Sequence, residues 1–237
     1  MAAPSAPEPA APEPSDPAPP DPAGFDAVLL DMDGTLVDTE GAWFEAERAV
    51  AARYGVELPE AARAALHGLD AHGLMDALEG RYDLRAPRER FLTELGEAVA
   101  DALRTTPARP GAVELVRELA DRGQPRAVVS NSPRAAIRAT LAPHPFDAWL
   151  PVRISVDDVA RGKPAPDPYL VAAERLGVAP QRCLAIEDSL PGARAAVAAG
   201  ATCLLVTHGE LDDADAHAAT PHVVASLTEV PGAAARH

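Results

Sequence analysis

Downstream of residue 110, short apolar runs alternate with longer segments in which apolar residues recur three and four positions apart. Short apolar runs bounded by turn residues are typical of buried strands, and the second pattern is typical of amphipathic helices. The runs predict strands at 126–130, 152–156, 183–187, 203–206 and 222–224. The helical pattern predicts helices at 112–122, 133–141, 168–176 and 193–199, and a glycine follows the first, third and fourth of them.

A further apolar run, residues 27–30, precedes this alternating region and predicts one more buried strand. Strands that alternate with helices form parallel sheets, because each helix carries the chain back to the start of the next strand. The helices then cover both faces of the sheet. We therefore predict an α/β fold with a doubly wound, Rossmann-like parallel sheet.

The segment 39–106 interrupts this alternation, because it contains no convincing strand. We interpret it as an all-helical domain inserted into a core domain made of 25–38 and 107–237. Residues 1–24 are mostly Ala, Pro and acidic residues, which carry too little apolar surface to fold, and we predict a disordered tail there. Within the insert, the helical stretches are expected at 42–53, 60–66, 73–79 and 88–104.

Composition restricts the partners and the location of the protein. Its net charge of −15 opposes binding to nucleic acids and to anionic membranes. The chain shows neither a long apolar span nor a basic start followed by an apolar stretch, so we predict no membrane segment and no secretory signal. Cys183 and Cys203 are expected to be buried thiols in a reducing compartment, although a disulfide between them stays open. The resulting expectation is a cytoplasmic monomer.

Two carboxylates, Asp31 and Asp33, directly follow the predicted strand 27–30. Residues two apart in an extended strand point to the same side, and Gly34 lets the chain turn sharply after them. Ligands of open α/β sheets bind in the crevice beyond the carboxyl ends of the strands. A carboxylate pair at that place can bind a hard cation or divide the roles of nucleophile and acid/base. The alternative is a plain acidic turn.

A hydroxyl and a lysine add to this candidate site. Ser130 ends a predicted strand just before a helix whose free N–H groups suit a phosphate, although Ser132 can also act as the N-cap of that helix. Lys163 stands in a loop stiffened by glycine and proline. In a site crowded with carboxylates, its ammonium can neutralise charge and hold both a phosphate and a nucleophile.

Two further acids, Glu187 and Asp188, follow the predicted strand that begins at Cys183. Placed beside the first carboxylate pair, they would repel it unless a cation bound between them. Mg²⁺ prefers oxygen ligands of this kind. The alternative is that Asp188 or Ser189 serves as the N-cap of the following helix.

In type, order and spacing, these residues resemble the four signatures of the haloacid dehalogenase-like phosphohydrolases. The first signature has the pattern D-x-D-G-T-x-x-D, which is similar to the stretch from Asp31 to Asp38. The resemblance runs from about residue 25 to the C-terminus, and the insert is similar to the cap of the helical-cap subgroup. The second, third and fourth signatures are matched in order by Ser130, Lys163 and the pair Glu187 and Asp188.

The resemblance implies a mechanism. Members of the family attack phosphorus with the first aspartate and pass through an aspartyl-phosphate, so Asp31 would be the nucleophile and Asp33 the acid/base. Mg²⁺ would be the cofactor, and a small-molecule phosphate ester would be the partner. The metal ligands would be Asp31, Asp33, Glu187 and Asp188, and the phosphate-binding residues would be Ser130, Asn131 and Lys163.

The resemblance also points to a substrate class. The run from Asp38 to Trp43 is similar to that of small-sugar phosphatases, whereas β-phosphoglucomutases carry a His in place of Trp43 and an Arg where Ala71 aligns. We therefore predict a Mg²⁺-dependent phosphatase that hydrolyses a small phosphomonoester, a sugar or polyol phosphate. The alternatives are a phosphomutase of the β-phosphoglucomutase type and a non-catalytic sugar-phosphate-binding protein. Glu40, Trp43 and His72 are the candidate substrate residues, although Trp43 can equally pack inside the cap and His72 can lie on the surface.

Overall fold

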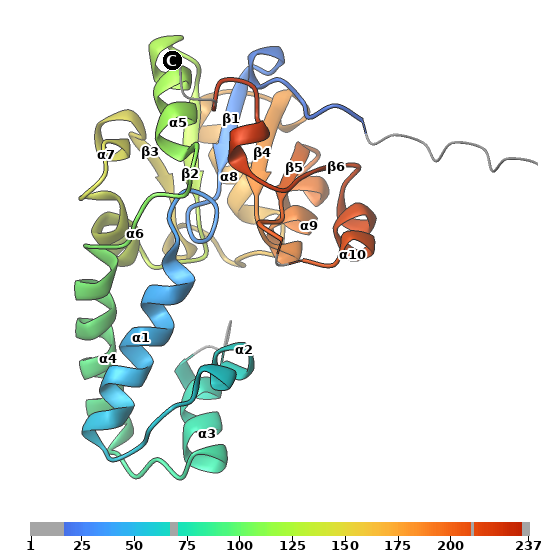
Figure 1. The fold of residues 1–237 in the computed structure, drawn as a ribbon. Coiled ribbons are helices and arrows are strands. Elements are labelled where there is room, and N and C mark those ends of the chain that lie inside the picture. The colour runs from blue at the N-terminus through green and yellow to red at the C-terminus, as the bar shows by residue number, and fades with distance from the viewer. Residues whose placement is uncertain (1–16, 67–70, 210, 234–237) are drawn as a thin grey trace, which may run out of the picture.

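This computed structural model describes residues 17–66, 71–209 and 211–233 of the chain. The core holds a sheet, and a helical unit projects from one end of that sheet (Figure 1). All strands of the sheet are parallel, and they lie in the order β3-β2-β1-β4-β5-β6. The strands are β1 (Ala27–Leu30), β2 (Arg126–Val129), β3 (Val152–Ile154), β4 (Cys183–Glu187), β5 (Thr202–Val206) and β6 (His222–Val224).

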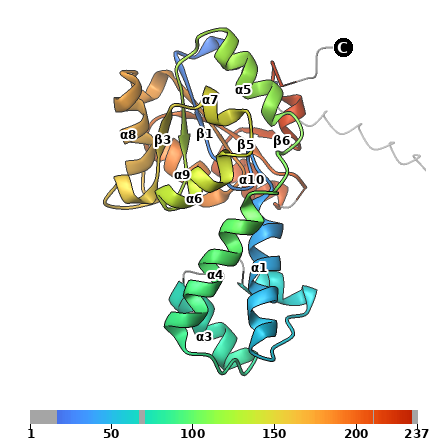
Figure 2. The ribbon, with the colours of Figure 1, turned by 90° about the vertical axis from the view of Figure 1, so that its left-hand side faces the viewer.

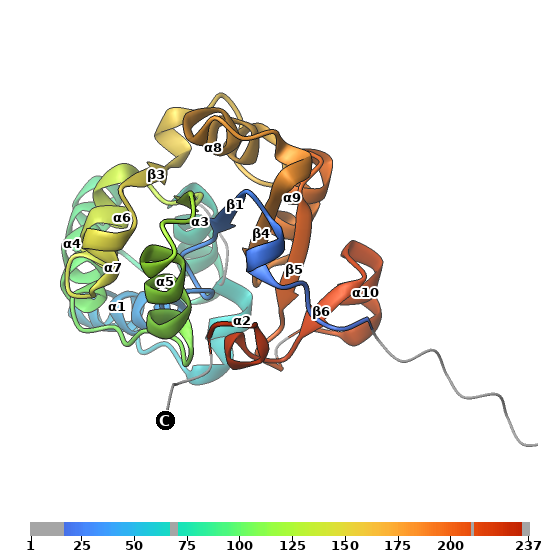
Figure 3. The same ribbon diagram turned by 90° about the horizontal axis from the view of Figure 1, so that it is seen from above.

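Helices cover both faces of the sheet. Successive residues of each strand point to opposite sides, and apolar residues on both sides are buried by these helices. In β1, Val28 and Leu30 pack into one apolar cluster, and Ala27 and Leu29 pack into the other. This arrangement confirms the predicted doubly wound α/β fold. As Figure 3 shows, one layer contains α5 (Ala112–Asp121), α6 (Arg134–Leu141) and α7 (Phe146–Trp149), and the other contains α8 (Asp167–Leu176), α9 (Leu190–Ala198) and α10 (Asp213–Ala219).

The sequence pattern did not predict α7 and α10. Helix α7 is only four residues long, which is too short for a helical period to stand out. Helix α10 is rich in Ala and Asp and buries Ala216, so its apolar stripe is weak. Its first turn is stabilised by Asp212, whose carboxylate accepts hydrogen bonds from the backbone N–H groups of Ala214 and Asp215.

The inserted segment folds into the helical unit and buries an apolar cluster of its own, which includes Phe44, Leu78 and Phe91. Helices α1 and α4 pack side by side and carry the chain into and out of this unit (Figure 2). A 3₁₀ turn, Glu60–Ala62, forms the first part of the predicted 60–66 helix. The helices of the unit are α1 (Thr39–Arg53), α2 (Arg63–Leu66), α3 (Ala71–Arg81) and α4 (Arg88–Leu103).

The two chain segments that join the core to the helical unit lie next to each other. Val37 and Ala108 form an antiparallel bridge. Beside it, the backbone N–H of Asp38 donates to the carbonyl of Pro107 at 3.1 Å, and that of Arg109 donates to the carbonyl of Leu36 at 2.9 Å. The domain boundaries near these residues stay a prediction.

The segment before β1 also packs on the core. Pro22–Gly24 forms a 3₁₀ helix in which Pro22 is buried, and the Gln124 amide donates to the carbonyls of Pro22 at 2.6 Å and Phe25 at 2.9 Å. The last residues of the predicted disordered tail, 22–24, are therefore ordered and packed on the core. Residues 1–16 lie outside the described part. Within the described ranges, no helix combines the length and the apolar character that crossing a membrane requires. Cys183 and Cys203 are free, buried thiols.

Candidate active site

Polar residues from three neighbouring strands meet at the carboxyl edge of the sheet. β1 lies between β2 and β4, and Leu30 at its end is level with Val128 and Ile186 of those strands. The residues that follow the three strands are therefore brought together, as the sequence predicted. They are Asp31 and Asp33 after β1, Ser130 to Ser132 after β2, and Asp188 after the last residue of β4, Glu187.

Asp31 is buried at the centre of this edge, with 6% of its surface exposed. Its Oδ1 accepts a hydrogen bond from the Lys163 ammonium at 2.6 Å, whereas its Oδ2 is buried without a hydrogen-bond partner among the described residues. Burial raises the pKa of Asp31 to about 7, against the opposing charge of Lys163. One oxygen of this carboxylate is thus held, and the other is left for a ligand.

Lys163 reaches the site from the loop between β3 and α8, and only 4% of its side chain is exposed. Its ammonium donates to Asp31 at 2.6 Å, to Glu187 at 2.6 Å and to the carbonyl of Val129 at 2.7 Å. Burial alone would lower the pKa of Lys163, but the charges of Asp31 and Glu187 raise it above its ordinary value. The lysine is therefore a permanently charged clamp on two carboxylates.

Asn131, a predicted phosphate ligand, holds the backbone of Lys163 in the structure. Its Oδ1 accepts from the Lys163 N–H at 2.8 Å, and its Nδ2 donates to the Lys163 carbonyl at 3.1 Å. Gly162 permits this contact, because a Cβ on that residue would lie 2.7 Å from the Asn131 Oδ1. The Asn131 side chain thus fixes the lysine loop, and contact of Asn131 with phosphate stays a prediction.

Glu187 is completely buried beneath the site. Its Oε1 accepts from Lys163 and from the hydroxyl of Tyr169, and its Oε2 accepts from the Ser189 hydroxyl at 3.1 Å. The carboxylate packs against Gly192 so closely that a Cβ there would lie 2.0 Å from it. Sequence reasoning missed Tyr169, since a tyrosine on the apolar face of a helix carries no sign of a buried acid opposite it.

Asp188 stands across from Asp31, beside the turn that follows β1. Its Oδ1 accepts from the hydroxyl of Thr35 at 3.0 Å. Gly34 adopts a φ of 83°, and a Cβ at this position would lie 1.9 Å from the Asp188 Oδ2. Only glycine therefore fits both the backbone conformation and the space. Burial raises the pKa of Asp188 well above its ordinary value, and the charge of Asp31 raises it further.

Asp33 is held by two serines. Its Oδ2 accepts from the hydroxyls of Ser130 at 2.9 Å and Ser132 at 2.8 Å, and the Ser130 hydroxyl accepts from the N–H of Ser132 at 2.9 Å. Sequence reasoning assigned Ser132 a capping role, but α6 begins after Pro133 with no side-chain cap. The Ser132 hydroxyl is instead committed to Asp33, so the serine pair orients the second carboxylate of the site.

The acidic residues of this edge fit a hard cation. Asp31, Glu187 and Asp188 each place a carboxylate oxygen within 4.8 Å of the others. Of these three, Asp31 and Asp188 keep oxygens for a metal, because Glu187 already accepts hydrogen bonds from Lys163, Tyr169 and Ser189. Metal binding by Asp33 and Glu187 stays a prediction. The Oδ2 of Asp31 is buried without a hydrogen-bond partner among the described residues, so it is an oxygen that a cation could bind.

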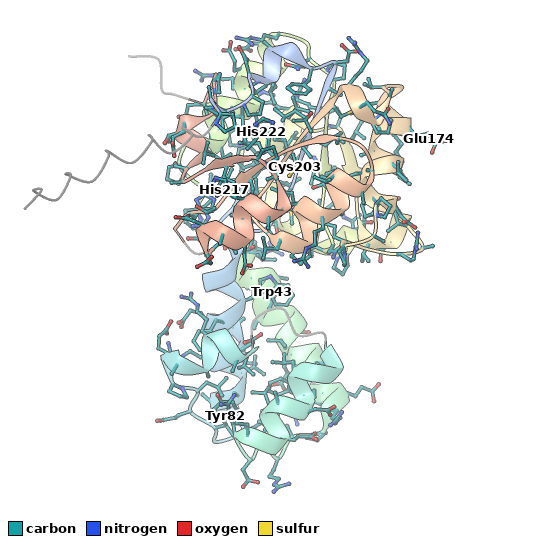
Figure 4. The ribbon with its side chains drawn as sticks, turned by 90° about the vertical axis from the view of Figure 1, so that its right-hand side faces the viewer. Trp43, Tyr82, Glu174, Cys203, His217 and His222 are labelled. Carbon is teal, nitrogen blue, oxygen red and sulfur yellow. The ribbon has the colours of Figure 1, made fainter. Side chains whose placement is uncertain are left out.

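A cavity of about 450 Å³ opens between this edge and the helical unit. Trp43 lines it, and Figure 4 shows Trp43 at the end of the unit that faces the core. Contact of Trp43 with a substrate stays a prediction. The side chains of Glu40 and His72 lie outside what the structure describes. Sequence reasoning missed Glu47 and Arg63, although Glu47 follows Trp43 by one helical turn. The helical unit contributes Thr39, Trp43, Phe44, Glu47, Arg63 and Leu66 to the lining.

Comparisons with known proteins agree with this geometry. The profile of the haloacid dehalogenase-like hydrolases matches residues 25–200. The chain is 34% identical over 182 residues to a bifunctional riboflavin kinase/FMN phosphatase of Arabidopsis thaliana; this match covers 76% of the chain and 48% of that protein, so the chain spans about half the length of that relative. It is 33% identical to a phosphorylated carbohydrates phosphatase of Thermotoga maritima, over 74% of the chain and 82% of that protein. The solved structure of a HAD family hydrolase from Deinococcus radiodurans with bound phosphate and sodium superposes with a TM-score of 0.72, at 34% identity over 87% of this chain and 93% of that one.

Proposed function

Because the chain belongs to the haloacid dehalogenase-like hydrolase family, we propose that it hydrolyses a small phosphomonoester, a sugar or polyol phosphate, through an aspartyl-phosphate on Asp31. The observation that carries this proposal is the pairing of two differently held carboxylates on one cavity. Asp31 is clamped by Lys163 with one oxygen free, and Asp33 is oriented by serine hydroxyls. This division suits a nucleophile and a separate acid/base.

Asp31 would carry the covalent step. Lys163 holds the carboxylate through its Oδ1, so the group cannot rotate freely and is oriented to attack phosphorus in line with the leaving oxygen. The new bond joins the Asp31 oxygen to phosphorus as the bond from phosphorus to the leaving oxygen breaks. Water then attacks the aspartyl-phosphate, which releases inorganic phosphate and restores the carboxylate.

Asp33 would move the protons of both half-reactions. Its Oδ2 is occupied by the hydroxyls of Ser130 and Ser132, which leaves Oδ1 to exchange a proton with the cavity. In the first half-reaction it protonates the leaving oxygen, and in the second it takes a proton from the attacking water. A positioned acid/base of this kind contributes ~10²–10⁴-fold to the rate.

The phosphoryl group would bind between the strand ends. Lys163 and the serine hydroxyls after β2 line the cavity next to Asp31 and are donors that suit phosphate oxygens. In the structure, Ser130 donates to Asp33, so binding a phosphate requires that hydroxyl to turn toward the ligand. A hydroxyl can rotate in this way without movement of the backbone.

A Mg²⁺ ion would be held by Asp31 and Asp188, with Glu187 behind them. When bound, the ion would neutralise the negative charge between the acids and the phosphate. Thr35 and Gly34 support the site by orienting Asp188 and by making room for it. The fit rests on the unpartnered buried oxygen of Asp31 and on the short spacing of the carboxylates.

The size and lining of the cavity support a small leaving group. A volume of about 450 Å³ lies in the range of small-molecule sites. The carbohydrate phosphatase among the relatives supports a sugar or polyol phosphate. A phosphomutase would use the same carboxylates, but the position at which β-phosphoglucomutases carry a His is Trp43, which lines the cavity. Hydrolysis is therefore the activity that we propose.

The test is an assay of phosphate release from a panel of phosphomonoesters with Mg²⁺. The panel includes hexose, pentose and polyol phosphates, and Asp31→Asn serves as the inactive control. We expect Mg²⁺-dependent release from at least one sugar or polyol phosphate and trapping of phosphate on Asp31 in rapidly quenched samples. Formation of an isomeric sugar phosphate that depends on a bisphosphate would identify a mutase instead, and no turnover of any ester would refute the proposal.

A further inference from the structure

Among the described residues of the helical unit, Glu47 is the buried acid that lines the cavity. Glu47 lies on α1 and lines the cavity opposite the carboxyl edge of the sheet, with only 8% of its surface exposed. Trp43 and Phe44 precede it by four and three residues on the same helix, so the three side chains share one face. All three line the cavity. Glu47 is therefore part of the wall that meets the leaving-group end of a substrate.

The Glu47 carboxylate is left without a counterpart. Among the described residues, no hydrogen bond or ion pair holds it. Arg63 also lines the cavity, but it forms an ion pair with Glu60 at 3.4 Å and stacks over the Phe44 ring at 5.6 Å. Burial raises the pKa of Glu47 to about 7. A covered carboxyl with no partner is unfavourable for the fold, so a role in ligand binding is the natural account of it.

We propose that Glu47 is a specificity-determining residue that accepts hydrogen bonds from hydroxyl groups of the sugar or polyol part of the substrate. This proposal rests on the proposed function. A carboxylate has two oxygens and can accept from two neighbouring hydroxyls, which is the feature that distinguishes a polyol from other small alcohols. Trp43, which is 37% exposed, adds an apolar surface beside it for the C–H groups of such a ligand.

The same residue would act against acidic leaving groups. A carboxylate or a second phosphate at the far end of the substrate would lie against Glu47 and would be repelled by its deprotonated form. Arg63 is the cation on this wall among the described lining residues, and Glu60 already pairs with it. Phosphoglycolate and sugar bisphosphates are therefore expected to be poor substrates. Neutral polyhydroxylated leaving groups are the class that the wall fits.

The experiment compares specificity constants of the wild type, Glu47→Gln and Glu45→Gln. Glu45 is the matched control, because it lies on the same helix but is solvent-exposed and pairs with Arg48 at 2.9 Å. The substrates are sorbitol 6-phosphate, fructose 1-phosphate, glucose 6-phosphate and ribose 5-phosphate, together with p-nitrophenyl phosphate, which has no hydroxyl groups, and phosphoglycolate. The readout is the ratio of kcat/KM for the best sugar or polyol phosphate to kcat/KM for p-nitrophenyl phosphate.

We expect Glu47→Gln to lower this ratio by ~10–100-fold, since the variant loses hydrogen bonds to a charged acceptor. The relative rate with phosphoglycolate should rise in the same variant. Glu45→Gln should leave the ratio within about twofold, as exposed ion pairs contribute little. If Glu47→Gln changes kcat/KM by the same factor for all substrates, or for none of them, Glu47 does not recognise the leaving group and the proposal is wrong. Glu47→Asp, which keeps the charge but withdraws it by one methylene, replaces the Gln variant if that does not fold.

A binding measurement separates this proposal from the proposed function. The sugar and polyol phosphates are titrated by calorimetry into Asp33→Asn and into the double variant that also carries Glu47→Gln. A dissociation constant that Glu47→Gln weakens by ~10-fold or more supports the role of Glu47 even if the wild type releases no phosphate. Equal affinities in the two forms, or no binding in either, overturn it even if the wild type is an active phosphatase.

Discussion

Replacing Glu47 by Gln is expected to stabilise the protein at alkaline pH. Burial raises the pKa of this carboxyl from 4.5 to about 7. The folded state therefore binds more protons than the unfolded state between these pH values, and the free energy of unfolding falls as the pH rises through that window. Gln does not titrate, so the variant lacks this fall.

The magnitude follows from the size of the shift. Each pKa unit corresponds to about 1.4 kcal/mol, so the full shift amounts to about 3 kcal/mol once the pH is well above 7. Glu47 borders a cavity that water can enter, which lowers the cost of its charge. As the pH rises from about 5 to about 8, we therefore expect the free energy of unfolding of the variant to increase by about 1.5 kcal/mol relative to that of the wild type.

The assay is urea denaturation of the wild type, Glu47→Gln and Glu45→Gln over this pH range in the presence of a chelator. Asp31 and Asp188 also have raised pKa values, but they are present in all three proteins, so subtraction removes their contribution. The exposed Glu45 should give a curve parallel to that of the wild type. Parallel curves for the wild type and Glu47→Gln, or a variant that becomes relatively less stable as the pH rises, would refute the assigned burial of Glu47.

Three further predictions concern the carboxyl edge of the sheet. Asp31→Asn should lower kcat by ~10³-fold or more with an unchanged circular dichroism spectrum, and activity above a few per cent of the wild type would exclude Asp31 as the nucleophile. Gly192→Ala should destabilise the protein by about 1–3 kcal/mol and lower kcat, because the added Cβ would collide with Glu187 and displace Lys163. In the same urea assay, Gly80→Ala should be neutral or stabilising, because Gly80 lies in a helix with open space around it. Chelation should abolish activity, and Ca²⁺ should inhibit the enzyme rather than restore its activity. The longer bonds and larger coordination shell of Ca²⁺ would shift Asp31, and a displacement of about 1 Å lowers the rate by ~10²-fold. Equal rates with Ca²⁺ and Mg²⁺ would contradict the metal assignment.

The parts of the site that the sequence predicted are those that depend on a strand and the residue after it. Asp31, Ser130 and Asp188 each follow an apolar run, and parallel topology alone brings such positions to one edge. The stiff loop around Lys163 and the excess of carboxylates made this lysine a candidate, and only its family resemblance assigned it to the strand ends, since no local pattern places a loop residue there. The fold was predictable for the same reason, because alternating apolar and helical periods determine the order of strands and helices.

The parts that the sequence did not predict depend on contacts between distant elements. Ser132 has the pattern of an N-cap, and only the position of Asp33 across the edge decides that its hydroxyl bonds there instead. Tyr169 reads as a core aromatic until Glu187 is placed beside its hydroxyl. Glu47 reads as one of several acids on a helix, and no local pattern indicates that it is buried beside a cavity.

The bridge between Val37 and Ala108 brings the two ends of the insert together. The segments that enter and leave the helical unit pair with each other. The helical unit is therefore attached to the core as a single loop whose two ends are held together. We expect that a different insert with its ends equally close together could replace it without changing the order of the strands or the residues at their ends. On the proposed assignments, the residues of the chemistry lie in the core and those of substrate choice lie in the insert, so design could alter the second set while keeping the first. A chimera that carries another cap between these two residues is the direct use of that property.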